Sequence, residues 1–89
     1  MNAQEMFEKL GYECTIGTDF EHYTKLFELG FIRIIFDNEQ RTLEILDDSG
    51  FAVYDLTIED LPPEIREAIY QRRKELGWHR MVRKYISID

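Results

Sequence analysis

Five short runs rich in β-branched and aromatic residues restrict the fold of this chain more than any other feature of its sequence. The runs are Tyr12–Ile16, His22–Glu28, Phe31–Phe36, Arg41–Leu46 and Phe51–Leu56. The residues between them that favour turns are Gly17–Asp19, Gly30, Asp37–Gln40 and Asp47–Gly50. Because strands joined by such short turns pair with their neighbours in sequence, this pattern predicts an antiparallel meander.

Two of these runs indicate how the predicted sheet is buried. In the run 41–46, Leu43 and Ile45 share one face while polar residues share the other, so this strand should have one face toward solvent. The run 31–36 is apolar at nearly every position and is interrupted only by Arg33. We therefore expect the run 31–36 at the centre of the sheet.

A short helix is predicted before the strands. Apolar residues follow Ala3 at positions i+3, i+4 and i+7, the last of them Leu10, which is the spacing of one helix face. Asn2 and Glu5 have the spacing of a capping box, and Gly11 should end the helix.

A longer helix is predicted after the strands. Pro63 suits its first turn, apolar residues recur at helical spacing from Ile65 to Leu76, and Gly77 should end it. Arg72 falls on the apolar stripe, so we expect its aliphatic part to lie along the apolar surface with the guanidinium at the edge. Beyond Gly77 the spacing fits either a helix or a strand, and both interpretations stay open.

Length and composition are consistent with one domain, residues 1–89. The chain has 89 residues, of which 44% are apolar and 33% are charged, enough for one core and a soluble surface. The predicted fold class is α+β: a short N-terminal helix, an antiparallel β-meander of four to five strands, and a longer C-terminal helix packed on one face.

Charge is distributed unevenly along the chain. The formal net charge is -7, and residues 1–60 contain 14 acidic and 4 basic residues, whereas residues 61–89 contain 4 acidic and 7 basic residues. The acidic part could simply keep the protein soluble. It could also occupy the basic groove of a nucleic-acid-handling protein in place of the nucleic acid, with Asp47 and Asp48 as candidate interaction residues.

The basic C-terminal end is the second candidate interaction region. Its candidate residues are Arg73, Trp78, Arg80, Arg83 and Lys84. Basic side chains interleaved with aromatic ones could bind single-stranded nucleic acid or an acidic partner, although exposed helix charges would look the same. Trp78 is either a lid over the core, which we favour, or an anchor in an interface.

The sequence suggests no set of catalytic or metal-binding residues. Cys14 could pair with His22 or His79, but their spacing is unspecific and a strand cysteine is more often a half-buried thiol. The acidic pairs 37/39 and 47/48 lack the spacing of a calcium loop and are explained by hairpin turns. We therefore expect a protein that is not an enzyme and has no cofactor or metal.

Cysteine usage and hydropathy indicate a compartment. Cys14 is the only cysteine, so an internal disulfide is impossible and a reducing cytoplasm is expected. No stretch of about 18 consecutive apolar residues occurs, so we expect no signal peptide and no contact with a membrane. The oligomeric state stays open.

Three segments resemble a known group of proteins. They are MNAQEMFEKLGYE at residues 1–13, the rhythm I.FD...RT..I from Ile34 to Ile45, and DLTIEDLPPEIREAIYQRRKELGW at residues 55–78. In these segments the chain is similar to small proteins of unknown function encoded by phages and prophages of Gram-positive bacteria. The resemblance implies binding of a host or phage protein, including inhibition of a nucleic-acid-directed defence of the anti-CRISPR or anti-restriction type. It brings no catalytic residues with it.

Overall fold

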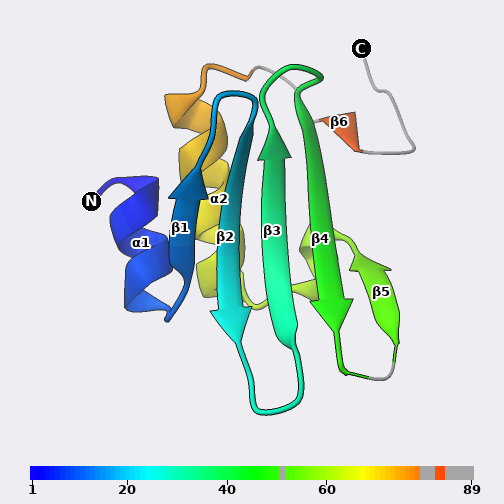
Figure 1. Ribbon diagram of the computed structural model, residues 1–89. Helices are drawn as coiled ribbons and strands as arrows, with labels where there is room; N and C mark the ends of the chain where they lie inside the picture. The colour runs from blue at the N-terminus through cyan, green and yellow to red at the C-terminus, as the bar shows by residue number, and fades with distance from the viewer. Residues whose placement is uncertain (51, 79–81, 84–89) are drawn as a thin grey trace.

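A computed structural model describes residues 1–50 and 52–78 of the chain, together with the backbone of residues 82–83. Figure 1 shows two α-helices, one turn of 3-10 helix (η1) and a single sheet. In chain order the elements are α1 (Ala3–Lys9), β1 (Glu13–Ile16), β2 (Phe20–Leu26), β3 (Phe31–Asp37), β4 (Thr42–Asp48), β5 (Val53–Leu56), η1 (Ile58–Asp60), α2 (Pro63–Glu75) and β6 (Val82–Arg83).

The sheet is the predicted antiparallel meander. Strands β1 to β5 are adjacent in sequence order, and each pair is antiparallel. The α+β fold, with a short N-terminal helix, five meander strands and a C-terminal helix packed against them, is confirmed. The short strand β6 was not predicted as such; it pairs in parallel with β4 at Thr42 and Leu43, so the strand interpretation holds for these two residues beyond Gly77.

Two predicted strand boundaries are wrong. Strand β2 begins at Phe20 and ends at Leu26, because the amide of Gly17 donates to the carbonyl of Phe20 at 2.8 Å and closes the turn earlier than expected. Strand β4 continues through Asp47 and Asp48, which the sequence pattern had assigned to a turn.

The predicted helix ends are present. The Asn2 side chain accepts a hydrogen bond from the amide of Glu5 at 2.8 Å, and the Glu5 carboxylate accepts one from the amide of Asn2 at 3.1 Å, which completes the capping box. Helix α2 has proline in its first turn, at Pro63, and is followed by Gly77 at φ 72°, a left-handed conformation that glycine adopts without strain.

The core lies between the two α-helices and one face of the sheet. Phe7 of α1 stacks on Tyr23 of β2 with ring centroids 4.0 Å apart, and both side chains are buried. Ile69 of α2 is fully buried in the same cluster. Trp78 is 6% exposed and its ring centroid lies 5.8 Å from that of Phe36, so Trp78 is the lid over the core that the sequence favoured.

Strand β3 occupies the middle of the five-stranded meander, as predicted. Ile34 and Phe36 are fully buried on the face that the helices cover, while Phe31 and Ile35 lie on the opposite face and are half-buried. Both faces of β3 are therefore apolar. In Figure 1, α2 lies behind the sheet and the other face is turned toward the viewer.

Two glycines hold the tips of neighbouring hairpins against each other. A Cβ on Gly30, in the β2–β3 loop, would lie 1.7 Å from the carbonyl oxygen of Asp48, and a Cβ on Gly50, in the β4–β5 loop, would lie 2.3 Å from that of Leu29. Neither position has room for a side chain. The two loops are thereby packed backbone to backbone at one end of the sheet.

Candidate functional site

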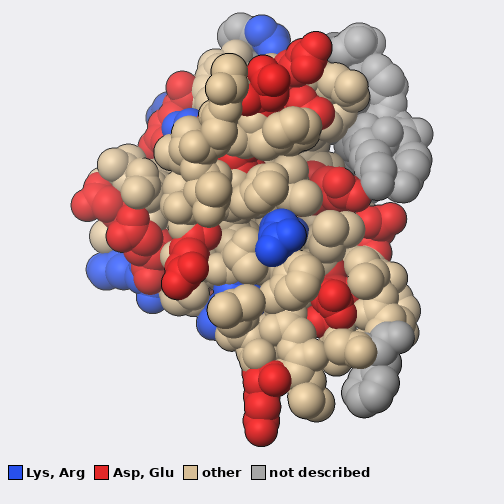
Figure 2. All heavy atoms as spheres, in the orientation of Figure 1, with Lys and Arg blue, Asp and Glu red and all other residues tan. Residues whose placement is uncertain are grey.

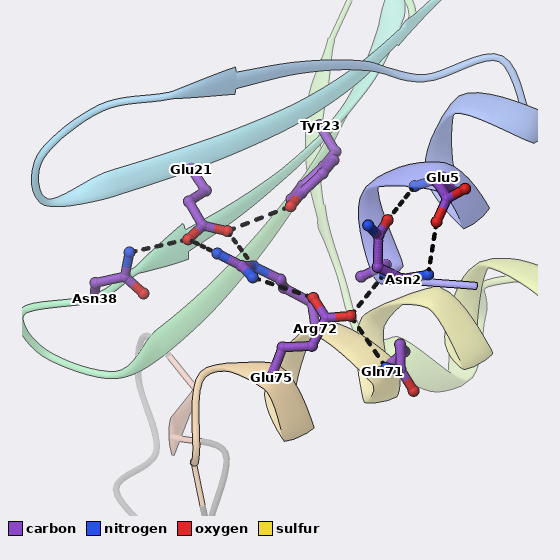
Figure 3. A network of polar contacts seen from close by, with 9 residues as sticks. Asn2, Glu5, Glu21, Tyr23, Asn38, Gln71, Arg72 and Glu75 are labelled. Carbon is purple, nitrogen blue, oxygen red and sulfur yellow. Dashed lines mark hydrogen bonds and ion pairs between the residues drawn. The ribbon is translucent and has the colours of Figure 1, made fainter.

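A carboxylate inside the protein forms the centre of a polar network. Glu21 on β2 is 2% exposed and receives two hydrogen bonds from the Arg72 guanidinium, from Nε at 2.6 Å and from Nη2 at 2.5 Å (Figure 3). The hydroxyl of Tyr23 donates at 3.3 Å and the amide of Asn38 donates at 3.2 Å. Every oxygen of this carboxylate is thus occupied from within the chain.

The network continues to the N-terminal helix. Arg72 Nη1 donates to Glu75 at 3.1 Å, and the other oxygen of Glu75 accepts from the amide of Ala3 at 2.9 Å and from Gln71 at 3.0 Å. The network therefore connects β2, α2 and the start of α1, as Figure 3 shows.

Two sequence-based expectations are corrected here. Glu21 was counted among the surface carboxylates, but it is buried. The Arg72 guanidinium was expected at the solvent edge, yet it reaches inward and pairs with Glu21. A buried carboxylate needs a donor of opposite charge, and no local pattern shows a partner that is 51 residues away in sequence.

The pKa of Glu21 reflects this pairing. Burial acts to raise the pKa, but the hydrogen bonds from Arg72 and Asn38, together with the charge of Arg72, outweigh it and hold the pKa below its ordinary value. Glu21 is therefore an ionised partner in a structural pair, and its carboxylate lacks a free oxygen that could accept a substrate proton.

Cys14 does not form the Cys–His pair that the sequence left open with His22. The register places Cys14 opposite Tyr23 and places His22 opposite Thr15, so the Cys14 and His22 side chains project from opposite faces of the sheet. Burial raises the pKa of the Cys14 thiol, which disfavours the reactive thiolate. His79 lies outside the described residues.

The other candidate is the face of the sheet that α1 and α2 leave uncovered. We call it the open face: the side-chain positions of β1–β5 that alternate with the core positions. Its apolar side chains are Phe20, Leu26, Phe31, Ile35, Leu46 and Val53. Leu26 is 70% exposed and Val53 is 61% exposed, which is unusual for residues in a sheet with a complete core on its other side.

Arg33 lies at the centre of the open face, between Phe31 and Ile35 along β3. Its guanidinium carbon is 4.6 Å from the centroid of the Phe31 ring, and its Nε donates to the Thr24 hydroxyl at 3.1 Å. The stacking and the hydrogen bond hold the side chain along the sheet, so Arg33 covers apolar surface as well as carrying charge.

The charge on the open face is mainly negative. Across β1–β5, the single basic position, Arg33, is accompanied by acidic positions at Glu13, Asp37, Glu44, Asp48 and Asp55. Figure 2, which views the molecule from this side, shows uncharged atoms over the strands, with acidic groups around them and few basic ones. The open face is thus an apolar surface with an acidic border.

The candidate pair Asp47 and Asp48 does not form one carboxylate cluster. Asp47 is opposite Ile32 and projects to the face that the helices cover, whereas Asp48 is opposite Phe31 and projects to the open face. Asp48 also accepts a hydrogen bond from the amide of Gly50 at 2.8 Å, the turn role that the sequence favoured.

The basic C-terminal end is only partly described. Arg73 donates from Nε to the carbonyl of Trp78 at 3.3 Å, and with Tyr70 and Lys74 it lines a shallow hollow beside that residue. The burial of Trp78 is inconsistent with a role as an interface anchor. Arg83 lies in β6, and Arg80 and Lys84 lie outside the described residues.

Two further features bear on the class of the protein. Within residues 1–50 and 52–78, no group of three or more histidine, cysteine or acidic side chains is arranged to hold a metal ion. In the same part of the chain, neither helix has the length and apolar character needed to cross a membrane. No family model, curated protein or solved structure matches this chain.

Proposed function

We propose that this chain is a non-enzymatic protein-binding module and that the open face is its binding surface. The observation that carries the proposal is the apolar character of β3 on both faces. A strand of this kind is typically covered on both sides, yet the described helices cover only one. The exposed side chains of Leu26 and Val53 extend this apolar surface to the strands on either side of β3 and β4.

The charge of the open face favours a protein over a nucleic acid. Five acidic positions against Arg33 would repel a phosphate backbone. The same charge disfavours two copies meeting face to face, because each copy would bring its excess of carboxylates to the contact. In the phage or prophage setting that the sequence resemblance implies, the partner would be a host or phage protein.

Two alternative functions from the sequence stay predictions. Inhibition of a nucleic-acid-handling defence protein would use acidic groups, and the acidic border of the open face is compatible with a basic partner of that kind. Direct nucleic-acid binding would depend on Arg80, Arg83 and Lys84. It has less support, since the aromatic ring expected to stack on bases, Trp78, is packed against Phe36.

The test is capture from lysate of the source organism or its host, with a matched pair of variants. Wild-type protein and Tyr70→Lys, changed on α2 away from the open face, should retain the same partner after nuclease treatment. Leu26→Lys/Val53→Lys should lose that partner while remaining folded by circular dichroism. Capture that survives equally in the double variant, or disappears with nuclease, contradicts the proposal.

A further inference from the structure

We infer that the open face binds a single amphipathic helix that carries basic and apolar residues. This inference rests on the proposed function and specifies the chemistry of the partner. It follows from the size of the face, its pattern of apolar and acidic side chains, and the rigidity of the backbone at its hairpin end.

The dimensions of the open face suit one helix. Five strands at a spacing of about 4.8 Å span roughly 19 Å, and the seven residues of β3 span roughly 20 Å along the strand. Helix α2 has 13 residues and is therefore about 20 Å long, and it covers the opposite face of the same sheet. A helix of three to four turns, of the length of α2, would cover the open face as well.

A second copy of the chain fits less well. The open face measures roughly 400 Å², whereas a stable interface between globular proteins buries about 800 Å² on each partner. Two copies would also place Asp48 and Asp55 of one chain against the same carboxylates of the other. Both the area and the charge favour a short, basic segment.

The pattern of side chains gives the orientation of the contacts. Leu26 and Phe31 are directly opposite each other on β2 and β3, and Leu46 and Ile35 extend the apolar surface diagonally across β4 and β3. Apolar side chains of a helix would lie along this surface, and lysine or arginine at its flanks would meet the carboxylates of the border.

The hairpin end of the open face is held in position before any partner binds. The close approach of Gly30 to Asp48 and of Gly50 to Leu29 joins the β2–β3 and β4–β5 loops, which carry Leu26 and Val53 at their bases. A surface that is already ordered loses less conformational entropy on binding, which favours affinity for a short segment.

The probe is a fluorescent 14-residue peptide of leucine and lysine with all leucines on one helix face. We expect it to bind the full chain and to become helical by circular dichroism. A peptide of leucine and glutamate with the same pattern should not bind. A leucine–lysine peptide with strict alternation, which favours a strand, should bind at least about tenfold more weakly.

The variants locate the binding. Leu26→Lys/Val53→Lys should weaken binding of the helical peptide at least about tenfold, whereas the matched change Tyr70→Lys on α2 should leave it unchanged. Glu13→Gln/Asp55→Asn should weaken binding and flatten its salt dependence. Glu67→Gln on α2, which removes one exposed acidic charge elsewhere, should do neither.

Other occupants give distinct results, and each would overturn the inference. Tighter binding of the alternating peptide that is insensitive to Leu26→Lys/Val53→Lys would indicate pairing at a sheet edge. A dimer in sedimentation that this double variant dissociates would assign the face to a second copy. Tighter binding of a fluorescent 14-nucleotide DNA than of the peptide would indicate a nucleic acid.

Failure of this inference can be distinguished from failure of the proposed function. If the helical peptide does not bind while Leu26→Lys/Val53→Lys still loses the captured cellular partner, the cationic-helix inference is wrong and the protein-binding function stands. If that double variant affects neither the peptide nor the captured partner, both are wrong.

Discussion

Removal of either partner of the Glu21–Arg72 pair should destabilise the protein, and by unequal amounts. Glu21 has a side chain that is 2% exposed, whereas the Arg72 side chain is 21% exposed. In Arg72→Met, the Glu21 carboxylate stays buried without its counter-charge. In Glu21→Gln, the Arg72 guanidinium can turn partly toward water and keeps Glu75 as a partner at 3.1 Å.

The structure sets the order and the approximate size of the two effects. Loss of one partner of a buried ion pair typically costs about 3–5 kcal/mol, and we expect this range for Arg72→Met. Glu21→Gln retains an oxygen that can accept a hydrogen bond, so its cost should be nearer about 1–3 kcal/mol. In a domain of 60–100 residues, each kcal/mol lowers Tm by about 4–8 °C.

Urea denaturation at pH 7 measures these free energies. The single tryptophan, Trp78, is packed against Phe36 and gives a fluorescence signal for unfolding. The double variant Glu21→Met/Arg72→Met should be more stable than Arg72→Met, because no charge is then left buried. Equal costs for the two single variants, or a double variant as unstable as their sum, would refute this reasoning.

The pH dependence provides an independent measure of the same pair. Since the pKa of Glu21 in the folded protein lies below its ordinary value of 4.5, the stabilisation is fully present above that pH and is lost as the pH falls through the folded pKa. Arg72→Met removes the groups that lower the pKa and leaves burial, which raises it. This variant should therefore gain stability as the pH is lowered from 7 toward about 5.

Three further substitutions test other parts of the fold. Gly30→Ala should destabilise the protein and separate the two hairpin tips, because its Cβ would meet the carbonyl oxygen of Asp48 at 1.7 Å; amide exchange in both loops should then increase. Trp78→Ala should cost about 3–5 kcal/mol in urea denaturation if the ring is the lid over the core. Asn2→Ala removes the N-cap of α1 and should cost about 1 kcal/mol in the same assay.

Much of the local structure was predictable because its causes lie within a few residues. The Asn2–Glu5 capping box and the positions of Pro63 and Gly77 depend on the backbone of the next turn, and all were confirmed. The meander followed from the turn residues between strands. Strand ends were less certain, since Asp48 suits both a turn and the last position of a strand.

The candidate site was harder to predict. The sequence directed attention to charged residues, including Asp47, Asp48 and the basic end, because runs of charge are visible in one dimension. The apolar run 31–36 already contained the main signal for the open face. It was interpreted as evidence for a central strand, which was right, but the consequence for its second face was not drawn.

By itself, the sequence determined the type and order of the elements, the centre of the sheet and the lid position of Trp78, because hydrophobic period, caps and turns act over short distances. Only the tertiary structure decided that Arg72 pairs with Glu21, that Asp47 and Asp48 face opposite ways, and that one apolar face of β3 lacks a helix. The reason is that these outcomes depend on strand register and on which face α1 and α2 cover. Contacts between residues far apart in sequence determine both.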